Sequence, residues 1–284
     1  MRILITGRSS YIGKSLQAWL LNYPNRYCVD LVSLREDGWK GISLAKYDVV
    51  FHAAGIAHVS SDPRLEPLYT AVNTDLAIEV ASKAKADGVH QFIFLSTILI
   101  FGHNCNENGF IDGKTLPDPR SIYAASKLKA EEGLRKLEDD EFRVAILRLP
   151  MVYGKDCKGN YQRLAKLARI TPVFPDFECR RSMIHIDNLC EFVRLIIDNT
   201  ERGTFHPQNA EYVKVSEMVR MIAEVHGKRV VLTKAFNPLV RLLCRRVEVM
   251  KKVFDNVAYD EGLSSYREPY QIRSLRESIE LSEY

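Results

Sequence analysis

The sequence predicts an α/β fold in which helices cover both faces of a doubly wound, mostly parallel sheet. A short apolar strand near the amino end runs through glycines into a helix. A second apolar run, residues 92–97, ends in two hydroxyls, as a buried strand does when its carboxyl end opens onto a site. Strand-like and helical patterns alternate as far as residue 149. Ligands bind such sheets across the carboxyl ends of the strands.

The first strand and helix enclose a turn of the kind that binds phosphate. The strand covers residues 2–6, and the helical pattern runs through residues 16–21. We expect Gly7 to permit the tight turn, Gly13 to let helix and strand pack closely, and the helix N-terminus to offer free N–H groups to a pyrophosphate. Ser10 replaces a middle glycine, which leaves a plain strand-to-helix turn as the alternative. The candidate cofactor-binding residues here are Gly7, Arg8, Ser10, Tyr11, Ile12 and Gly13.

The end of the second strand bears on which dinucleotide would bind. The strand lies near residues 28–34 and leads to Arg35, whereas folds that prefer NAD usually place an acid here for the ribose hydroxyls. Arg35 and Arg8 are cations that suit a ribose 2′-phosphate. The sequence therefore favours NADP slightly over NAD, against the alternative of two solvated arginines. The connection 36–46 is short, so any strand in it should be abbreviated.

The alternation continues along the chain. Residues 48–54 form a buried strand, and residues 68–86 have helical spacing closed by Asp87-Gly88, a C-cap signal. Residues 102–119 are rich in Gly, Asn, Asp and Pro and predict a loop at the mouth of a site. Small residues after the strand would let a cofactor lie against the chain, and the candidate contacts are Ala53, Ala54 and Gly55.

A tyrosine and a lysine follow that loop one helical turn apart. Tyr123 and Lys127 fall at i and i+4 of a helix that should run to about Leu137, so they share one face. An ammonium beside a phenol favours the phenolate, and we expect the pKa of Tyr123 to fall. Such a tyrosine can take or give a proton at a carbinol carbon. Thr97 could hold the substrate oxygen in place.

Together these residues resemble the extended short-chain dehydrogenase/reductases, in the branch of nucleotide-sugar epimerases and dehydratases. The resemblance implies a Rossmann domain over residues 1–150 and a smaller C-terminal α+β substrate domain over 151–284, whose segments could interleave. The matching motifs, in family order over roughly residues 1–235, are Thr6-Gly7…Gly13, His52-Ala53-Ala54, Val72-Asn73, Ser96-Thr97…Phe101-Gly102, Pro119 to Lys127, and Arg148 to Gly154.

The resemblance also implies roles for single residues. Tyr123 would be the acid/base, Lys127 its partner and a ribose ligand, and Thr97 the hydroxyl of the triad. Ser96 would be a further substrate contact or a substitute for Thr97. Arg181 would grip the nucleotide diphosphate by bidentate pairing, with a solvated surface arginine as the alternative.

Two further positions depart from the family pattern. Ser182 stands where common epimerases have an aspartate, and Met151 stands where many relatives have an asparagine. Both departures leave the identity of the sugar nucleotide undetermined, and they affect the expected chemistry less. A 4-ketoreductase with exchangeable cofactor is slightly favoured over a 4-epimerase that keeps its NAD. A silent cofactor-sensing or scaffold protein is the alternative from a different class.

Composition narrows the other classes of function. A net charge of +4 is too small to argue for nucleic acid, although it suits an anionic ligand. Six scattered cysteines without a Cys-x-x-Cys pair indicate reduced thiols and no metal site. The chain starts directly with a strand pattern, and no apolar run approaches the ~20 residues of a membrane span. We therefore expect a cytoplasmic protein. His185 lies in an apolar run and should be a core residue.

The C-terminal part carries two weaker signals. Ser216 is expected to cap a helix that runs through Val225. Residues 228–252 hold eight basic residues and one acid, with apolar residues at roughly helical spacing, so contact with an anionic membrane surface is a minority alternative to a helix packed on the domain. Relatives often form homodimers through helices like 68–86 and 123–137, and the small residues that would permit this are Ala77, Ala81, Ala84 and Ala130.

Overall fold

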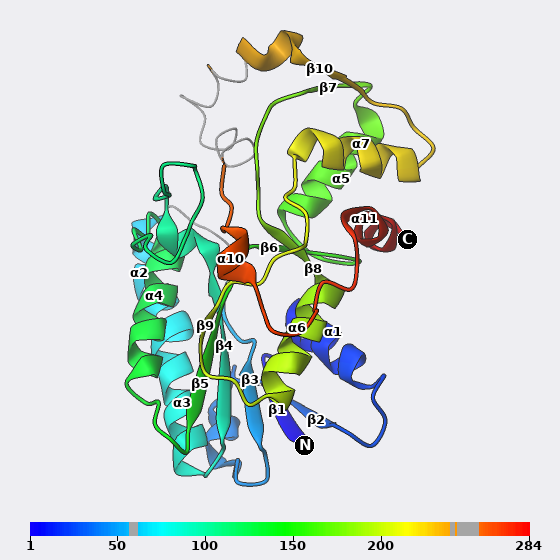
Figure 1. The fold of residues 1–284 in the computed structure, drawn as a ribbon. Coiled ribbons are helices and arrows are strands. Elements are labelled where there is room, and N and C mark those ends of the chain that lie inside the picture. Colours follow the sequence, from blue (N-terminus) through cyan, green and yellow to red (C-terminus); the bar gives the residue numbers. More distant parts are fainter. Residues whose placement is uncertain (57–61, 239–241, 243–255) are drawn as a thin grey trace.

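A six-stranded parallel sheet forms the centre of the larger domain (Figure 1). The structure is a computed structural model and describes residues 1–56, 62–238, 242 and 256–284. The sheet confirms the predicted α/β, doubly wound architecture. Its strands, in sheet order, are β2 (Cys28–Val32), β1 (Arg2–Thr6), β3 (Val49–His52), β4 (Gln91–Thr97), β5 (Arg143–Leu149) and β9 (Gly203–Phe205).

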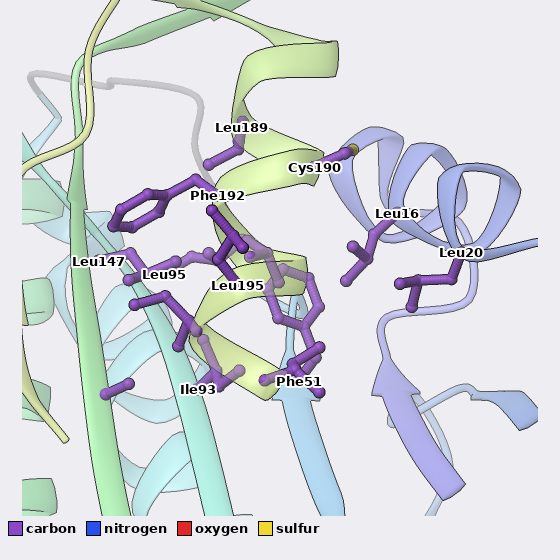
Figure 2. Close-up of a cluster of buried hydrophobic side chains, with 14 of the residues drawn as sticks. Leu16, Leu20, Phe51, Ile93, Leu95, Leu147, Leu189, Cys190, Phe192 and Leu195 are labelled. Carbon is purple, nitrogen blue, oxygen red and sulfur yellow. The ribbon is translucent and has the colours of Figure 1, made fainter. Parts of the chain in front are cut away.

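Helices cover both faces of this sheet. On one face, α1 (Tyr11–Leu20) and α6 (Ile186–Asp198) join the strands in one buried cluster, in which Phe192 of α6 lies among strand residues (Figure 2). On the other face, α3 (Leu76–Ala86) and α4 (Ile122–Arg135) pack against the alternate strand residues. Because both faces are covered, β4 is buried along its whole length, as its continuous apolar pattern predicts.

Two connections of the larger domain have a more irregular backbone than the sequence pattern indicates. A 3₁₀ helix, η1 (Asp37–Gly41), stands in the short connection after β2, and its Trp39 is buried. The helix expected over residues 68–86 is divided into α2 (Glu66–Tyr69), the π-helical turn η3 (Thr70–Asp75) and α3. A further 3₁₀ turn, η2 (Pro63–Leu65), precedes α2. Gly88 has a φ of 83° directly after the C-cap of α3, as the predicted C-cap requires.

The four alanines that suggested a dimer contact face the wrong way for it. All four are buried inside the domain, where they pack α3 and α4 onto the sheet. The small side chains therefore serve close packing within the domain, and a homodimer through these helices stays a prediction. A dimer formed through α3 and α4 would have to use other side chains of these helices.

A second buried cluster forms the core of the smaller domain. Helices α5 (Asn160–Ile170), α7 (Val215–Val225) and α11 (Leu275–Glu283) surround two short sheets. The strand pairs are β6 (Met151–Tyr153) with β8 (Met183–His185) and β7 (Val173–Pro175) with β10 (Val231–Thr233). The short helices η4 (Ile98–Phe101), η5 (Lys234–Phe236) and α10 (Glu261–Ser264) complete the described elements. After residue 150 the chain returns to the larger domain, because β9 is a strand of the large sheet and α6 packs against that sheet.

Ser216 does not cap α7 as expected. The helix begins one residue earlier, with Lys214 at the N-cap, and the Ser216 hydroxyl donates to Asp176 at 3.2 Å. The apolar positions of the predicted amphipathic helix, residues 239–254, lie outside the described residues apart from Leu242. Within residues 1–56, 62–238 and 256–284, every helix is too short or too polar to cross a bilayer.

Candidate active site

Thr97 and Tyr123 meet at the carboxyl end of β4. Thr97 is the last residue of this buried strand, and its hydroxyl accepts from the Leu99 amide at 3.2 Å, which caps η4. The phenol of Tyr123 lies near the same hydroxyl, which acts to lower the pKa of the phenol. Ser121 caps α4 through the Ala124 amide, so Tyr123 lies in the first turn of that helix. The structure thus brings together two residues separated by a long loop in the sequence.

Lys127 lies one turn further along α4 and reaches the neighbouring strand ends. It is buried, and its ammonium lies 4.6 Å from the centre of the Phe94 ring on β4. A Cβ added to Gly55 would come within 3.4 Å of Lys127 Nζ, so glycine at that position leaves room for the ammonium. Lys127 is therefore directed toward the loop after β3, where the small residues Ala53 and Ala54 lie.

The expected fall in the pKa of Tyr123 is not found. Burial raises the pKa of Tyr123 to about 12, the nearby Thr97 hydroxyl offsets part of the rise, and Tyr69 adds to it. Burial likewise lowers the pKa of Lys127 to about 8, against a smaller opposing effect of Glu131. The attraction between the two charges alone predicts a lower pKa for Tyr123. Desolvation of both groups disfavours both charged forms and outweighs that attraction.

Ser96 points toward α4, where its hydroxyl is engaged about two turns beyond Tyr123. Its hydroxyl donates to Glu131 Oε1 at 2.5 Å. The Glu131 side chain is 0% exposed and also accepts from Arg148, at 2.8 Å, and from Arg135, at 2.7 Å. Ser96 shares the α4 side of β4 with Phe94, whereas Thr97 ends the strand near Tyr123. The Ser96 hydroxyl thus serves to anchor α4, and its expected substrate contact stays a prediction.

Asn73, which belongs to one of the family motifs, is a further residue beside the candidate site. It lies buried in the π-helical turn η3, where its side-chain oxygen accepts from the Ile56 amide at 2.9 Å. Its side-chain amide donates to the Ile56 carbonyl and to the Ser126 hydroxyl, each at 3.1 Å. Asn73 thus ties the loop after β3 to α4, beside Lys127. The signal for it was an asparagine within an otherwise apolar helical pattern.

The turn after β1 has the geometry expected for phosphate binding. Gly7 has a φ of 82°, and a Cβ there would lie 2.8 Å from the Ala54 amide nitrogen, so this position requires glycine. A Cβ on Gly13 would lie 3.0 Å from Ile5, which confirms that glycine permits close packing of α1 on β1. The amides of Tyr11 and Ile12, at the first two positions of α1, have no acceptor within the helix. They would suit a pyrophosphate.

Ser10 fits the turn without a glycine. It adopts an extended conformation with a φ of −64°, and its hydroxyl accepts from the Gly13 amide at 3.3 Å as the N-cap of α1. A serine therefore stabilises the helix start without backbone strain. The neighbouring Tyr11 turns its side chain inward, where its buried hydroxyl lies next to Gly154. Burial raises the pKa of Tyr11, so its contact with a cofactor would be made by its backbone.

The two candidate arginines for a 2′-phosphate lie at one corner of the sheet. The Val32 carbonyl at the end of β2 accepts from the amides of Gly7, at 3.0 Å, and Arg8, at 3.2 Å. Arg35 follows three residues after Val32, and both arginine side chains are exposed. The phosphate turn and the end of β2 are thus joined by their backbones, which brings Arg8 and Arg35 to the same edge. These residues fit a dinucleotide with a phosphorylated ribose.

Comparison with known proteins places the chain in a family. The profile of the NAD dependent epimerase/dehydratase family matches residues 3–209. The chain belongs to this family. UDP-glucose 4-epimerase of Vibrio cholerae is 30% identical over 77% of this chain and 69% of its own length. GDP-6-deoxy-D-mannose reductase of Pseudomonas aeruginosa is 24% identical over 79% of this chain and 80% of its own length.

The fold is similar to that of solved structures along the entire chain. The structure of RMD from Pseudomonas aeruginosa complexed with NADPH covers 100% of both chains with a TM-score of 0.77 and 19% identity. At this identity the likeness concerns the fold alone. It includes the smaller domain, which lies largely beyond the residues that the profile of the epimerase/dehydratase family matches.

Arg181 lies in the smaller domain of this family member, just before β8. Its amide and carbonyl pair with Val213 at 3.1 and 2.9 Å, and the next amide, of Ser182, donates to the Val257 carbonyl at 2.9 Å. The segment is therefore held between two others, and the Arg181 side chain is half-buried. Its role as a diphosphate ligand stays a prediction.

The histidine expected in the core is found there. His185 is buried and caps α6 by accepting from the Asp187 amide at 3.3 Å. Burial lowers the pKa of His185 to about 4, which keeps the ring neutral. The confirmed core role agrees with its apolar sequence context.

Proposed function

We propose that this chain is an NAD(P)-dependent oxidoreductase that acts at C4 of the sugar in a nucleotide-diphosphate sugar. The observation that carries the proposal is the proximity of Thr97 to the Tyr123 phenol, with the buried Lys127 one turn away, beside a turn suited to a dinucleotide. When bound, the nicotinamide supplies or accepts the hydride. Family membership and both relatives support the same chemistry.

The protonated Tyr123 phenol is suited to the reduction step. With a pKa of about 12, the phenol carries its proton at neutral pH and can donate it to the oxygen of a 4-keto sugar. Thr97 would orient that oxygen, and Lys127 would hold the nicotinamide ribose and stabilise the resulting phenolate. Taking a proton from a C4 hydroxyl is harder for the same phenol. An epimerase needs the same protonated phenol when it reduces its keto intermediate, so the preference for a 4-ketoreductase rests on the absent ribose acid after β2 and on Ser182 after Arg181.

The proposed substrate contacts lie in both domains. Arg181 would hold the diphosphate, and Arg8 with Arg35 would hold the 2′-phosphate of NADP. The cytoplasm is the proposed compartment, because the cysteines within the described ranges, Cys28, Cys105, Cys157, Cys179 and Cys190, are all free thiols.

A direct assay separates the reductase from the epimerase. Purified protein is mixed with NADPH and a 4-keto sugar nucleotide, and the absorbance of NADPH is followed. We expect stoichiometric consumption of NADPH, with faster turnover than with NADH. Protein that already carries NAD and interconverts UDP-glucose and UDP-galactose without added cofactor would contradict the reductase.

The 4-epimerase is the second candidate, because the relative with 30% identity has that name. A cofactor-binding scaffold without turnover has lost its support, since Ser10 fits the turn as a helix cap. Tryptophan fluorescence quenching by NADPH together with absent turnover on every 4-keto and 4-hydroxy sugar nucleotide would restore it.

A further inference from the structure

The small sheet of β7 and β10 exposes apolar side chains where a surface sheet usually carries polar ones. The strands are parallel, with Val173 opposite Val231 and Phe174 opposite Leu232. Phe174 and Leu232 face the core of the smaller domain, as expected for one side of a sheet. Val173 and Val231 face outward, and Val231 is 53% exposed. Two neighbouring valines on the outer side form a continuous apolar strip.

The end of α5 extends this strip. The helix buries one side in the domain core and turns Leu167 and Ile170 outward, and Ile170 is 78% exposed. Ile170 precedes Val173 by three residues. Phe236, in η5 beside β7, is also exposed. Figure 1 shows β7 and β10 at the end of the molecule away from the six-stranded sheet, so this face is free of the larger domain.

Cations surround the apolar strip, and acids are missing from its segments. Residues 160–175 and 228–238 contain six lysines and arginines and no aspartate or glutamate. Arg169 is paired with Glu283, whereas Lys228 donates to the Arg169 carbonyl at the end of α5. The carboxylate after β7, Asp176, is paired with Lys214. The exposed cations around the strip are Arg163, Lys166, Lys228, Arg229 and Lys234.

We propose that this face, formed by the outer side of α5 and by β7 and β10, docks on an anionic lipid surface. Aliphatic side chains would enter the headgroup region, and the surrounding cations would pair with lipid phosphates. Charge complementarity selects this partner, because a face with exposed cations and no acid of its own repels a second copy of itself. The docking is peripheral and separate from the reaction proposed above.

Vesicle sedimentation tests the proposal with the full-length chain. The protein is incubated either with vesicles of phosphatidylcholine alone or with vesicles that also contain about 30 mol% phosphatidylglycerol. The second composition gives the vesicles a negative surface potential. We expect recovery with the anionic vesicles only, and release as the salt concentration rises. Equal recovery with both compositions, or none with either, would overturn the proposal.

Variants assign the binding to this face. The pair Ile170→Glu and Val231→Glu should lower the bound fraction by about tenfold or more, and Arg163→Gln with Lys166→Gln by about fivefold for each charge. Leu21→Glu is the matched control, since Leu21 is 72% exposed after α1 on the larger domain, and it should bind as the parent does. Unchanged vesicle binding by the Ile170→Glu, Val231→Glu variant would contradict the assignment. The assignment would also be wrong if the parent protein forms a dimer in ultracentrifugation, binds no vesicles, and becomes a monomer with the same two substitutions.

Discussion

Two hydroxyls stand side by side at the end of β4, and only one of them lies near the Tyr123 phenol. Thr97 lies near the Tyr123 phenol, whereas the Ser96 hydroxyl donates to Glu131 of α4. Family motifs show that a hydroxyl is needed near this position but not which way each residue points. The register of β4 in the sheet decides this, because side chains alternate along a strand.

Exchanging these hydroxyls one at a time should separate their roles. Thr97→Ala removes the partner of the Tyr123 phenol, and we expect kcat to fall by about 10²-fold, with Thr97→Ser restoring most of it. Ser96→Ala is the control and should keep kcat within about threefold while lowering the melting temperature, since Glu131 loses a donor. Steady-state kinetics and thermal melts measure both. A larger loss of kcat in Ser96→Ala than in Thr97→Ala would contradict the assignment.

Lys127 is held in the folded protein at a cost in stability. Burial lowers its pKa from an ordinary 10.5 to about 8, so below pH 8 its charged form destabilises the folded state by about 3 kcal/mol. Between pH 8 and 10.5 the unfolded state binds the extra proton, and this penalty disappears as pH rises. Replacement by an uncharged side chain of similar length should therefore stabilise the protein most at neutral pH.

We predict that Lys127→Met raises the free energy of unfolding at pH 7 by about 1–3 kcal/mol, because some packing is lost along with the charge. The gain should shrink between pH 8 and 10.5. Urea unfolding at several pH values measures it, with Lys129→Met, an exposed lysine of the same helix, as control. A gain that is equal at pH 7 and pH 10.5, or equal in the control, would show that the charge of Lys127 is not the cause.

Among the elements, the turn from β1 to α1 is the most tightly specified. Gly7 combines a positive φ with close approach to the Ala54 backbone, whereas Gly88 has nearly the same φ, 83°, with nothing within 4 Å of an added Cβ. A comparison of substitutions at Gly7 and Gly88 therefore distinguishes the cost of backbone strain from the cost of steric contact. Glycine at position 7 is required by the packing of two loops that a cofactor would touch.

Gly7→Ala should destabilise the protein by about 2–4 kcal/mol, and Gly88→Ala by about 1 kcal/mol, the cost of a left-handed residue alone. Chemical denaturation gives both values. The Gly7 variant should also weaken NADPH binding, because the loop of Ala54 has to move. Equal destabilisation by the two substitutions would mean that the close approach in the turn carries no cost.

At the scale of the whole molecule, the last helix closes the core of the smaller domain. Glu283 of α11 accepts from Tyr161 at 2.8 Å and Arg169 at 2.7 Å on α5, and pairs with His226, at 2.7 Å, after α7. Burial acts to raise the pKa of Glu283, but the bonds from His226, Arg169 and Tyr161 lower it overall. At pH values above the ordinary titration range of a glutamate, Glu283 is charged. Its carboxylate then ties α5, α7 and α11 of the smaller domain together.

Glu283→Gln should lower the melting temperature at pH 7 by about 2–8 °C, corresponding to about 1–2 kcal/mol for the weakened charged contacts. The difference from the parent should diminish as pH falls through the lowered pKa of Glu283, because the parent carboxyl then loses its charge. Differential scanning calorimetry across that range checks this. Glu280→Gln is the control on the same helix, and a matching effect there would contradict the role of Glu283.

The sequence predicted the sheet, the phosphate turn and the pair of Tyr123 and Lys127, because each depends on local periodicity or on glycine. It could not predict the pKa of Tyr123, because burial by distant segments sets the desolvation of both groups. The sequence also could not predict that α6 and β9 join the larger domain, because an apolar helix pattern does not show which hydrophobic core the helix packs against. The role of Asn73 in tying the loop after β3 to α4 could not be predicted either, because it depends on the π-helical turn that positions its side chain.

The most direct test of the account is single-turnover oxidation of NADPH by Tyr123→Phe. Removal of the phenol should slow the reduction of a 4-keto sugar nucleotide by about 10²–10⁴-fold, while the Kd for NADPH, measured by fluorescence, changes by less than about threefold. Turnover within about tenfold of the parent, with NADPH still bound, would show that another group donates the proton to C4.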